Sequence, residues 1–351
     1  MKIETLLRLM VEKDASDLLI TVGAPPVLRI SGNLVQTDYE SLTAASAKEL
    51  IYSMLSQEQK DKFEKKKELD FPFEVGNIAR FRVNLHMQRE TVAAALRIIP
   101  ADIPKLEDLR LPKAIADLSN EARGLVLVTG PTGSGKTTTQ ACMIDLINSS
   151  RKCHIITVED PIEYIHKHKK SIVEQREIGV DTESFDIALR HVLRQNPDVI
   201  LIGEMRDIES IQVAITAAET GHLVISTLHT NDAVQSIDRM IDVFPPHQQS
   251  QIRLQLSLAL SGVVAQQLVP RADGKGLIVC VEVLKVTTGV RNIIRKAQTQ
   301  EIYSMMEIGA KYGMQTMDSA IKDLYKSKLI TYETALSRAI NPEQLAKTLG
   351  T

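Results

Sequence analysis

The sequence predicts an α/β protein with two domains, the larger of which contains a parallel β-sheet. First, the chain has 351 residues, which is longer than one hydrophobic core usually serves. Second, short apolar runs alternate with segments of helical period after residue 112, the pattern of a parallel sheet covered by helices on both faces. Third, a glycine-rich motif follows the first of these runs and precedes a helical segment.

Residues 1–100 are expected to form a small α/β domain. Turn residues at Ser31-Gly32-Asn33 and at Gly76-Asn77 separate short apolar runs, and each therefore predicts a β-hairpin. The other expected elements are strands at 18–22 and 92–99 and helices at 1–8, from Thr43 to about residue 55, and at 57–67.

Prolines at positions 100, 104 and 112 keep residues 101–112 out of regular structure, so this segment is the expected linker. Residues 113–351 form the expected second domain, with strands at 125–128, 154–158, 199–202 and 223–226. The uncharged stretch 254–270 falls short of a membrane span, so a buried helix is expected there. From about residue 287 onward the pattern predicts a series of C-terminal helices.

The glycine-rich motif matches G-x-x-x-x-G-K-[ST], which binds nucleotide phosphates when it links a strand to a helix. Backbone N–H groups of the turn and the positive end of the helix attract anionic oxygens. We expect Lys136 on the β- and γ-phosphates of ATP and the Thr137 hydroxyl on Mg²⁺. The expected phosphate-binding residues are Gly130, Pro131, Thr132, Gly133, Ser134, Gly135, Lys136, Thr137 and Thr138.

Acidic and histidine side chains follow the later strands, at the sheet edge where such folds bind ligands. Glu159 and Glu163 follow the second strand, Glu204 the third and His229 the fourth. Glu204 is expected to polarise the attacking water, with Glu159 and Glu204 holding Mg²⁺ through water and His229 sensing the γ-phosphate. Acids also cluster in ordinary loops, so this assignment depends on the nearby phosphate loop.

Several arginines are candidates for the positive charge that phosphoryl transfer requires, which often comes from a neighbouring subunit. Each of them could equally form a surface ion pair. Arg190 and Arg194 are spaced four residues apart on one expected helix. Together the candidates favour a nucleotide clamped between domains or subunits, with Arg194 and Arg206 acting in catalysis and Arg82, Arg97, Arg190 and Arg239 around the nucleotide.

Composition narrows the class of protein. A formal net charge of -2 lacks the basic field of a protein that grips nucleic acid, so no nucleic-acid partner is expected. The three cysteines form neither C-x-x-C pairs nor an even framework, which indicates a reduced, cytoplasmic compartment without a zinc site. Residues 1–8 carry charges within their apolar pattern, which is not typical of a signal peptide.

Four ordered motifs resemble those of the bacterial secretion and type IV pilus assembly ATPases. They are the phosphate loop at 130–138, an Asp box at 157–163, a Walker B segment at 193–207 and a His box at 220–233. Within that family, the short N-terminal domain and residues 266–271 and 312–318 are similar to the pilus retraction branch, which serves twitching motility.

The resemblance implies a RecA-like ATPase domain with a helical C-terminal tail, a PAS-like N-terminal domain and a ring of six subunits with ATP and Mg²⁺ at the domain interface. It also implies an inner-membrane pilus platform protein as partner, pilin as an indirect partner, and peripheral association with the cytoplasmic face of the inner membrane.

Other functions remain open. Pilus extension and type II secretion ATPases share these motifs, but they usually carry a longer N-terminal extension and a tetracysteine zinc element, both absent from this sequence. A DNA or protein translocase on a RecA-like core and a non-hydrolysing regulatory paralogue are further alternatives.

Overall fold

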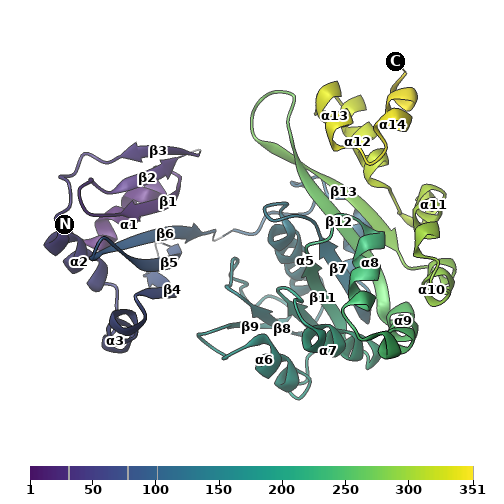
Figure 1. The fold of residues 1–351 in the computed structure, drawn as a ribbon, viewed down its shortest axis with the longest axis horizontal. Helices are drawn as coiled ribbons and strands as arrows, with labels where there is room; N and C mark the ends of the chain where they lie inside the picture. The colour runs from purple at the N-terminus through teal and green to yellow at the C-terminus, as the bar shows by residue number, and fades with distance from the viewer. Residues whose placement is uncertain (31, 77–78, 101, 351) are drawn as a thin grey trace. The chain divides into compact units, whose positions relative to one another are not determined.

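The computed structural model describes residues 1–30, 32–76, 79–100 and 102–350. They divide into two compact units, each with its own β-sheet (Figure 1). The first comprises Met1–Asp102 together with Glu163–Ile165, and the second comprises Ile103–Ile162 and His166–Thr351. The α/β class predicted from the sequence is confirmed.

The first unit contains a six-stranded antiparallel sheet in the order β3-β2-β1-β6-β5-β4. Both predicted hairpins form, as the pairs β2–β3 and β4–β5, although Ser31, Asn77 and Ile78 of their turns lie outside the described residues, as does Ala101 of the expected linker. The strands are β1 (Ala15–Ile20), β2 (Val27–Ile30), β3 (Asn33–Gln36), β4 (Glu68–Val75), β5 (Ala79–Gln88) and β6 (Thr91–Ile99).

Three helices complete this unit: α1 (Ile3–Glu12), α2 (Ala44–Tyr52) and α3 (Gln57–Lys66). Helix α2 begins where expected, because the Thr43 side chain accepts the Ser46 N–H while the Ser46 side chain accepts the Thr43 N–H. It ends at Tyr52 rather than near residue 55, and Ser56 then caps α3. Apolar side chains from the helices and from alternate positions of the strands, such as Phe81 and Val83, form one core.

The second unit contains a seven-stranded sheet in the order β13-β12-β7-β11-β10-β8-β9. Neighbouring strands run parallel except for β12 and β13, which pair antiparallel. The strands are β7 (Gly124–Thr129), β8 (His154–Glu159), β9 (Ile172–Glu177), β10 (Val199–Ile202), β11 (Leu223–Leu228), β12 (Leu260–Pro270) and β13 (Leu277–Lys285).

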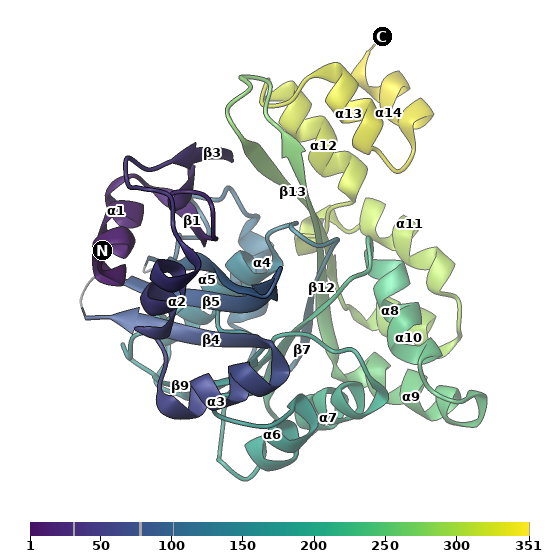
Figure 2. The same cartoon turned by 60° about the vertical axis from the view of Figure 1, so that its left-hand side comes forward.

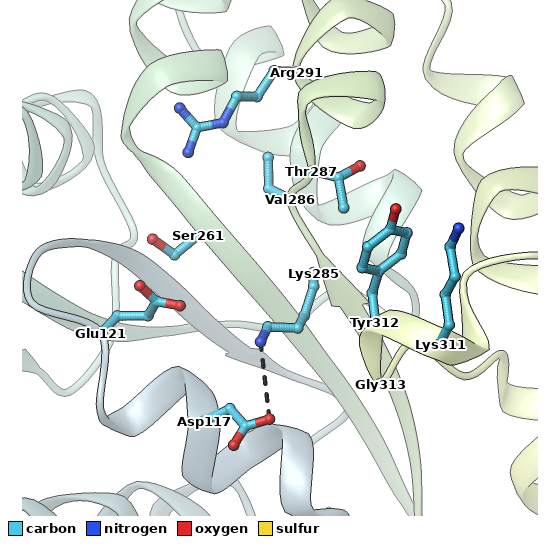
Figure 3. A pocket seen from close by; sticks show the side chains of 10 residues that line it. All are labelled: Asp117, Glu121, Ser261, Lys285, Val286, Thr287, Arg291, Lys311, Tyr312 and Gly313. Carbon is cyan, nitrogen blue, oxygen red and sulfur yellow. Dashed lines mark ion pairs between the residues drawn. The ribbon is translucent and has the colours of Figure 1, made fainter.

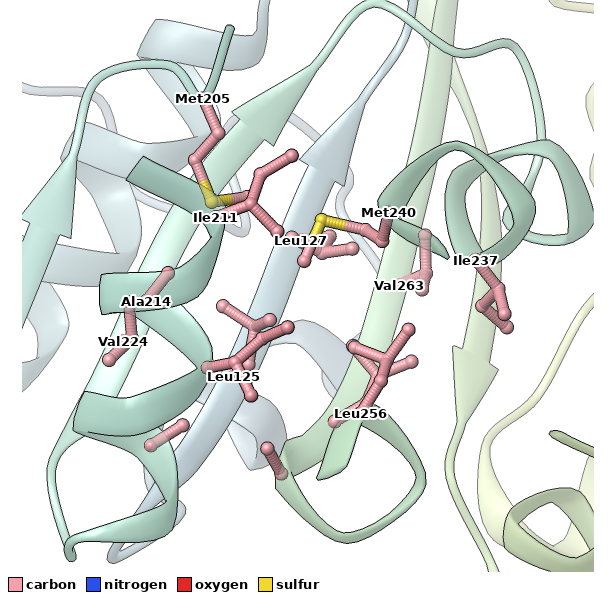
Figure 4. Packing of buried hydrophobic residues seen from close by; sticks show 14 of the residues in the cluster. Leu125, Leu127, Met205, Ile211, Ala214, Val224, Ile237, Met240, Leu256 and Val263 are labelled. Carbon is pink, nitrogen blue, oxygen red and sulfur yellow. The ribbon is translucent and has the colours of Figure 1, made fainter. Parts of the chain in front are cut away.

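Each face of this sheet buries its own hydrophobic cluster, as expected for strands covered on both sides. Leu125 and Leu127 of β7 pack against α7 (Ile208–Glu219), α8 (Ala233–Asp242) and α9 (Pro246–Ala259) (Figure 4). Val126 and Val128 point to the other face, where α4 (Lys113–Ser119) and α5 (Lys136–Ser150) lie. This alternation along β7 explains why the strand reads as an uninterrupted apolar run.

The C-terminal helices form where the sequence predicts them. Helix α12 packs on β13 and α13 on β12 (Figures 1 and 2). None of the helices that the structure describes is long and apolar enough to cross a bilayer. The remaining helices are α6 (Phe185–Val192), α10 (Thr288–Arg295), η1 (Thr299–Glu301), α11 (Ile302–Glu307), η2 (Ala310–Tyr312), α12 (Met317–Lys326), α13 (Tyr332–Arg338) and α14 (Pro342–Leu349).

The prediction for residues 254–270 is wrong. Helix α9 ends at Ala259, and Leu260–Pro270 forms β12, which lies between β7 and β13. A strand buried on both faces shows no alternation of polar and apolar residues, so it resembles a buried helix in sequence. The backbone of Leu260 is already extended, with φ of -69° and ψ of 124°.

A carboxyl group, that of Glu282 on β13, is fully buried in this unit. Its Oε1 accepts the Ala233 N–H at 2.8 Å, and its Oε2 accepts the Met317 N–H at 3.3 Å. Burial raises the pKa of this carboxyl to about 7, because the interior disfavours the charged form more than the two hydrogen bonds favour it.

Glu282 is expected to make folding stability depend on pH. The pKa rises from 4.5 to about 7 on folding, so between these values the folded chain binds the proton more tightly and stability falls as pH increases. Relative to Glu282→Gln, the wild type should therefore lose about 3 kcal/mol of its free energy of unfolding between pH 4.5 and pH 8. Urea unfolding followed by circular dichroism at several pH values measures this difference. Glu301→Gln, at an exposed carboxylate, is the control, and a difference for Glu282→Gln that does not change with pH would contradict the assignment.

Candidate functional site

The glycine-rich motif forms the turn between β7 and α5. A Cβ atom at Gly130, where φ is +143°, would lie 2.2 Å from the Gln266 carbonyl oxygen and 2.6 Å from Ser134 Oγ. Only glycine fits this close approach, and helix α5 begins directly after the turn, at Lys136. The N–H groups in the first turn of α5 therefore surround a concave stretch of backbone suited to an anion.

The polar side chains of the turn are also suited to phosphate. Lys136 Nζ donates to the carbonyls of Gly130 and Pro131 at 2.8 and 3.0 Å, which holds the ammonium group over the turn. Ser134 Oγ is buried and has no hydrogen-bond partner among the described residues. Thr137 and Thr138 occupy the first turn of α5, half-buried. The loop thus combines a cation, hydroxyl groups and helix N-terminal amides within a few residues.

Gln266 of β12 supports this loop from a neighbouring strand. Its side chain is buried, and its Nε2 donates to the Ser134 carbonyl oxygen at 2.7 Å across 132 residues of sequence. The sequence analysis did not predict this contact. A glutamine within the apolar run of a buried strand is the signal that could have indicated it.

Strand register brings the ends of three later strands together. Ile202 of β10 pairs with Val158 of β8 and with Ser226 of β11. Beyond that row, the Gly203 N–H donates to the Val158 carbonyl at 2.8 Å. Thr227 Oγ1 in turn donates to the Gly203 carbonyl at 2.6 Å.

Gly203, the residue directly before Glu204, lies against β8, the strand that leads into the Asp box. A Cβ atom at this position would lie 3.3 Å from the Val158 carbonyl oxygen and 3.4 Å from Glu159 Cα. A side chain here would crowd the neighbouring backbone, which explains the glycine.

Glu204, Arg206 and His229 form one cluster at this edge. The Glu204 side chain is only 14% exposed, its Oε1 pairs with Arg206 Nη2, and its Oε2 lies 3.3 Å from His229 Nε2. The hydrogen bond that Arg206 donates to Glu204, together with the negative charge of this carboxylate, raises the pKa of the Arg206 guanidinium. The cluster can accept a hydrogen bond from water, because each carboxylate oxygen has a second lone pair. His229 and Arg206 are both more than half exposed and can therefore reach a bound molecule.

The two Asp-box carboxylates lie in different surroundings. Glu159 is buried, and its Oε1 accepts hydrogen bonds from Thr157 Oγ1 at 2.6 Å and Gln175 Nε2 at 3.1 Å. The Gln175 contact comes from β9, a strand that the sequence analysis did not predict. Glu163 is exposed and belongs to the segment that groups with the first unit.

Several of the six arginines pair with acids of their own unit. Arg97 Nε lies 2.8 Å from Asp17 Oδ1, and Arg190 Nε lies 2.9 Å from Asp186 Oδ1. Arg82 is the cross-strand partner of Arg97 and lies 4.0 Å from Asp70. Arg206 pairs with Glu204, whereas Arg194 and Arg239 are exposed.

Arg194 is not on the same helix as Arg190, which corrects the expected arrangement. Helix α6 ends at Val192. Asn196, two residues past Arg194, has a φ of +54°, which is left-handed backbone that an α-helix does not contain. It also precedes a proline, which disfavours the helical conformation at the residue before it.

A separate cavity of about 530 Å³ lies beside α4, β12, β13 and α10 (Figure 3). Its lining mixes cations such as Lys285 and Arg291 with Asp117 and Glu121, and Lys285 Nζ lies 3.9 Å from Asp117 Oδ2. The residues that line it include none of the phosphate loop, so this cavity is distinct from the candidate nucleotide site.

Replacing Lys136 is expected to remove nucleotide binding while the fold stays intact. Lys136→Ala should weaken ADP affinity by about 100-fold or more, because it removes the charge-assisted hydrogen bonds that the ammonium group is expected to donate to phosphate oxygens, each worth about 1.5–3 kcal/mol. Fluorescence anisotropy with a labelled ADP measures the affinity, circular dichroism checks the fold, and Lys152→Ala at an exposed position is the control. Unchanged binding or hydrolysis in Lys136→Ala would overturn the site assignment.

Gln266→Leu tests whether β12 supports the phosphate loop. The variant leaves the buried Ser134 carbonyl without its donor and so loosens the loop, which the nucleotide must then order at the expense of binding energy. We expect the dissociation constant for ADP to rise about 10-fold, which corresponds to about 1.4 kcal/mol. The matched control is Gln267→Leu, because the adjacent glutamine donates instead to the Arg338 carbonyl at 3.3 Å. Equal effects of the two variants would contradict a specific role for Gln266.

Comparison with known proteins places this geometry in a family. The model of the family described as Type II/IV secretion system protein matches residues 4–334. The type IV pilus ATPase PilU of Pseudomonas aeruginosa is 44% identical over 345 residues, which cover 98% of this chain and 90% of PilU. The type IV pilus retraction ATPase PilT of the same organism is 43% identical over 343 residues, 98% of this chain and 99% of PilT.

A solved structure shows the same fold. A crystal structure of the pilus retraction motor PilT with bound ADP superposes with a TM-score of 0.94 at 47% sequence identity, covering 99% of each chain. The chain therefore belongs to the type II/IV secretion system protein family, as one of its ATPases.

Proposed function

We propose that this chain is the subunit of a hexameric motor that hydrolyses ATP to retract type IV pili in twitching motility. The observation that carries the proposal is the likeness to a pilus retraction ATPase along nearly the whole chain, in sequence and in fold. The phosphate loop and the Glu204–Arg206–His229 cluster supply the chemistry that such a motor needs.

Hydrolysis follows from the residues at the sheet edge. The loop amides, with Lys136, Ser134 and Thr138, hold the phosphates of ATP. Glu204 accepts a hydrogen bond from the attacking water and orients it toward the γ-phosphorus. Arg206 is paired with this carboxylate and helps to hold it in place. His229, hydrogen-bonded to the same carboxylate, senses whether the γ-phosphate is present.

The site also suits Mg²⁺, which neutralises charge on the transferring phosphoryl group when bound. Magnesium usually keeps several waters and takes only one or two protein ligands besides phosphate oxygens. Thr137 is the direct ligand in this proposal, and Glu159 and Glu204 act through water. Glu159 fits this role because its carboxylate is fixed by Thr157 and Gln175.

The arginines support assembly into a ring of six. Arg194 and Arg239 lie on the surface of the ATPase unit, where the charge can reach another subunit. Arg190 and Arg82 can leave their partners Asp186 and Asp70 at low cost, because exposed ion pairs contribute about 0–1 kcal/mol. The Arg97 guanidinium is exposed, although its partner Asp17 is buried. Together with Glu163, these residues are the proposed remainder of the nucleotide site.

The motor acts at the cytoplasmic face of the inner membrane. We propose that the ring engages the pilus platform protein, associates only peripherally with the membrane and returns pilin subunits to it without contacting nucleic acid. A pilus extension or type II secretion ATPase is the alternative from the same family, and a DNA or protein translocase is a more distant one.

Deleting the gene in its host distinguishes retraction from extension. The deletion strain is expected to keep or accumulate surface pili and to lose twitching, because assembly continues while disassembly stops. Counting pili by electron microscopy and measuring twitching zones test this expectation. Complementation with wild type or Lys152→Ala should restore twitching, and Glu204→Gln should not. Cells without pili would contradict retraction and support the extension alternative.

Two measurements on the purified chain check the rest of the proposal. Light scattering with ATP and Mg²⁺ should give a hexamer, and a monomer at high concentration would count against the ring. Turnover should disappear in Glu204→Gln, and turnover stimulated by DNA would support the translocase instead.

A further inference from the structure

The Glu282 carboxylate lies where two helices begin. Ala233, whose N–H donates to Oε1, is the first residue of α8, and Met317, whose N–H donates to Oε2, is the first residue of α12. Helix N-termini carry partial positive charge and unpaired N–H groups, so an anion between them stabilises both. One buried carboxylate thus contacts the first residues of two helices from distant parts of the chain.

Helix α8 leads from Glu282 to the nucleotide site. Ala233 follows His229 by four residues, and between them Thr230 Oγ1 lies 2.7 Å from Ser236 Oγ. Ser236 Oγ also lies 3.4 Å from Thr129 Oγ1, on the residue that immediately precedes Gly130 of the phosphate loop. The first turn of α8 is therefore hydrogen-bonded to the strand that carries the loop.

Helix α12 leads from Glu282 to the end of the chain. The residue after Met317 is Asp318, whose Oδ1 accepts the Ile340 N–H at 2.7 Å and whose Oδ2 accepts the Asn341 N–H at 2.9 Å. Asn341 is the N-cap of α14. The position of the first turn of α12 consequently determines where α14 begins.

The strand register of the sheet places Glu282 close to Thr129, the residue before the phosphate loop. Ala265 of β12 pairs with Thr129 of β7 on one side and with Glu282 of β13 on the other, so the three residues form one row. Side chains at paired positions point to the same face of a sheet. Thr129 and Glu282 are fully buried and flank the small side chain of Ala265 beneath α8.

We propose that Glu282 is a positioning residue that couples the nucleotide state of the phosphate loop and His229 to the C-terminal helices α12, α13 and α14. A displacement of the first turn of α8 moves one of the two N–H groups on the carboxylate. The carboxylate can follow it only by changing its bond to Met317, because no water replaces a lost partner in the interior. The inference rests on the proposed function in one respect, that nucleotide binds the phosphate loop.

Hydrogen exchange of the full-length protein tests the coupling. Peptides that cover α12 to α14 are compared without nucleotide, with ADP and with a non-hydrolysable ATP analogue. The wild type should change its exchange in these helices on binding nucleotide. Glu282→Gln keeps the shape of the side chain but can accept only one of the two N–H groups, so the nucleotide-dependent change in exchange rates should shrink by about 3- to 30-fold.

A second variant breaks the link from the other helix. Met317→Pro removes the N–H donor at a position where proline is accommodated, since it is the first residue of a helix and Thr316 before it is extended. It leaves the bond from Ala233 to Glu282 in place. The loss of the buried methionine side chain acts equally in all nucleotide states. This variant should lose the nucleotide-dependent change as well, whereas Glu301→Gln should retain it.

Each outcome decides the inference. Faster exchange in all states with an undiminished nucleotide-dependent change would show that Glu282 is merely structural and would overturn the proposal. A wild type that binds labelled ADP but shows no response in α12 to α14 overturns the coupling and leaves the proposed motor intact. A wild type that binds no nucleotide overturns both. If Glu282→Gln does not fold, Met317→Pro gives the answer.

Discussion

The hydrogen bonds that hold β8, β10 and β11 in parallel register place three motif ends side by side. Gly203 donates its N–H to the Val158 carbonyl of β8 and accepts a hydrogen bond from the Thr227 hydroxyl of β11, and β7 brings the phosphate loop to the same edge through its pairing with β11. A slip of one residue in any of these pairs would turn Glu204 or His229 to the wrong face. Apolar clusters cover both faces, so such a slip would exchange the side chains that pack into the two clusters, and the packing of the sheet and the geometry of the site therefore depend on the same register.

Three polar side chains inside this apolar frame connect it to the site. Gln266, Glu159 and Glu282 are buried, and each is hydrogen-bonded to backbone or to a neighbouring side chain. Burying such groups costs free energy that apolar residues would not, so their partners are required for the fold to tolerate them. Their contacts join strands to the phosphate loop, to the Asp box and to the starts of two helices. The polar groups whose burial costs free energy therefore lie where they hold the candidate site and these helices in position.

The charged side chains at the sheet edge differ from these buried groups, because most of them are exposed to solvent. Glu204 is nearly buried, but its partners Arg206 and His229 are exposed, and the guanidinium groups of the other candidate arginines are exposed as well. Exposed pairs hold their members weakly. A nucleotide, with several negative charges close together, can therefore recruit these cations without disturbing the core.

The sequence by itself determined the elements whose signals are local. The strand, turn and helix of the phosphate loop, both N-terminal hairpins and the C-terminal helices follow from turn residues, caps and period, and Glu204 and His229 follow from strand ends. The tertiary structure decided that 260–270 is a strand, that Arg194 lies beyond α6, and that Gln266 and Glu282 touch the loop and the helix starts. These contacts join residues 35 to 132 positions apart. Local period and propensity contain no information about which strands become neighbours, because pairing depends on the packing of the whole sheet.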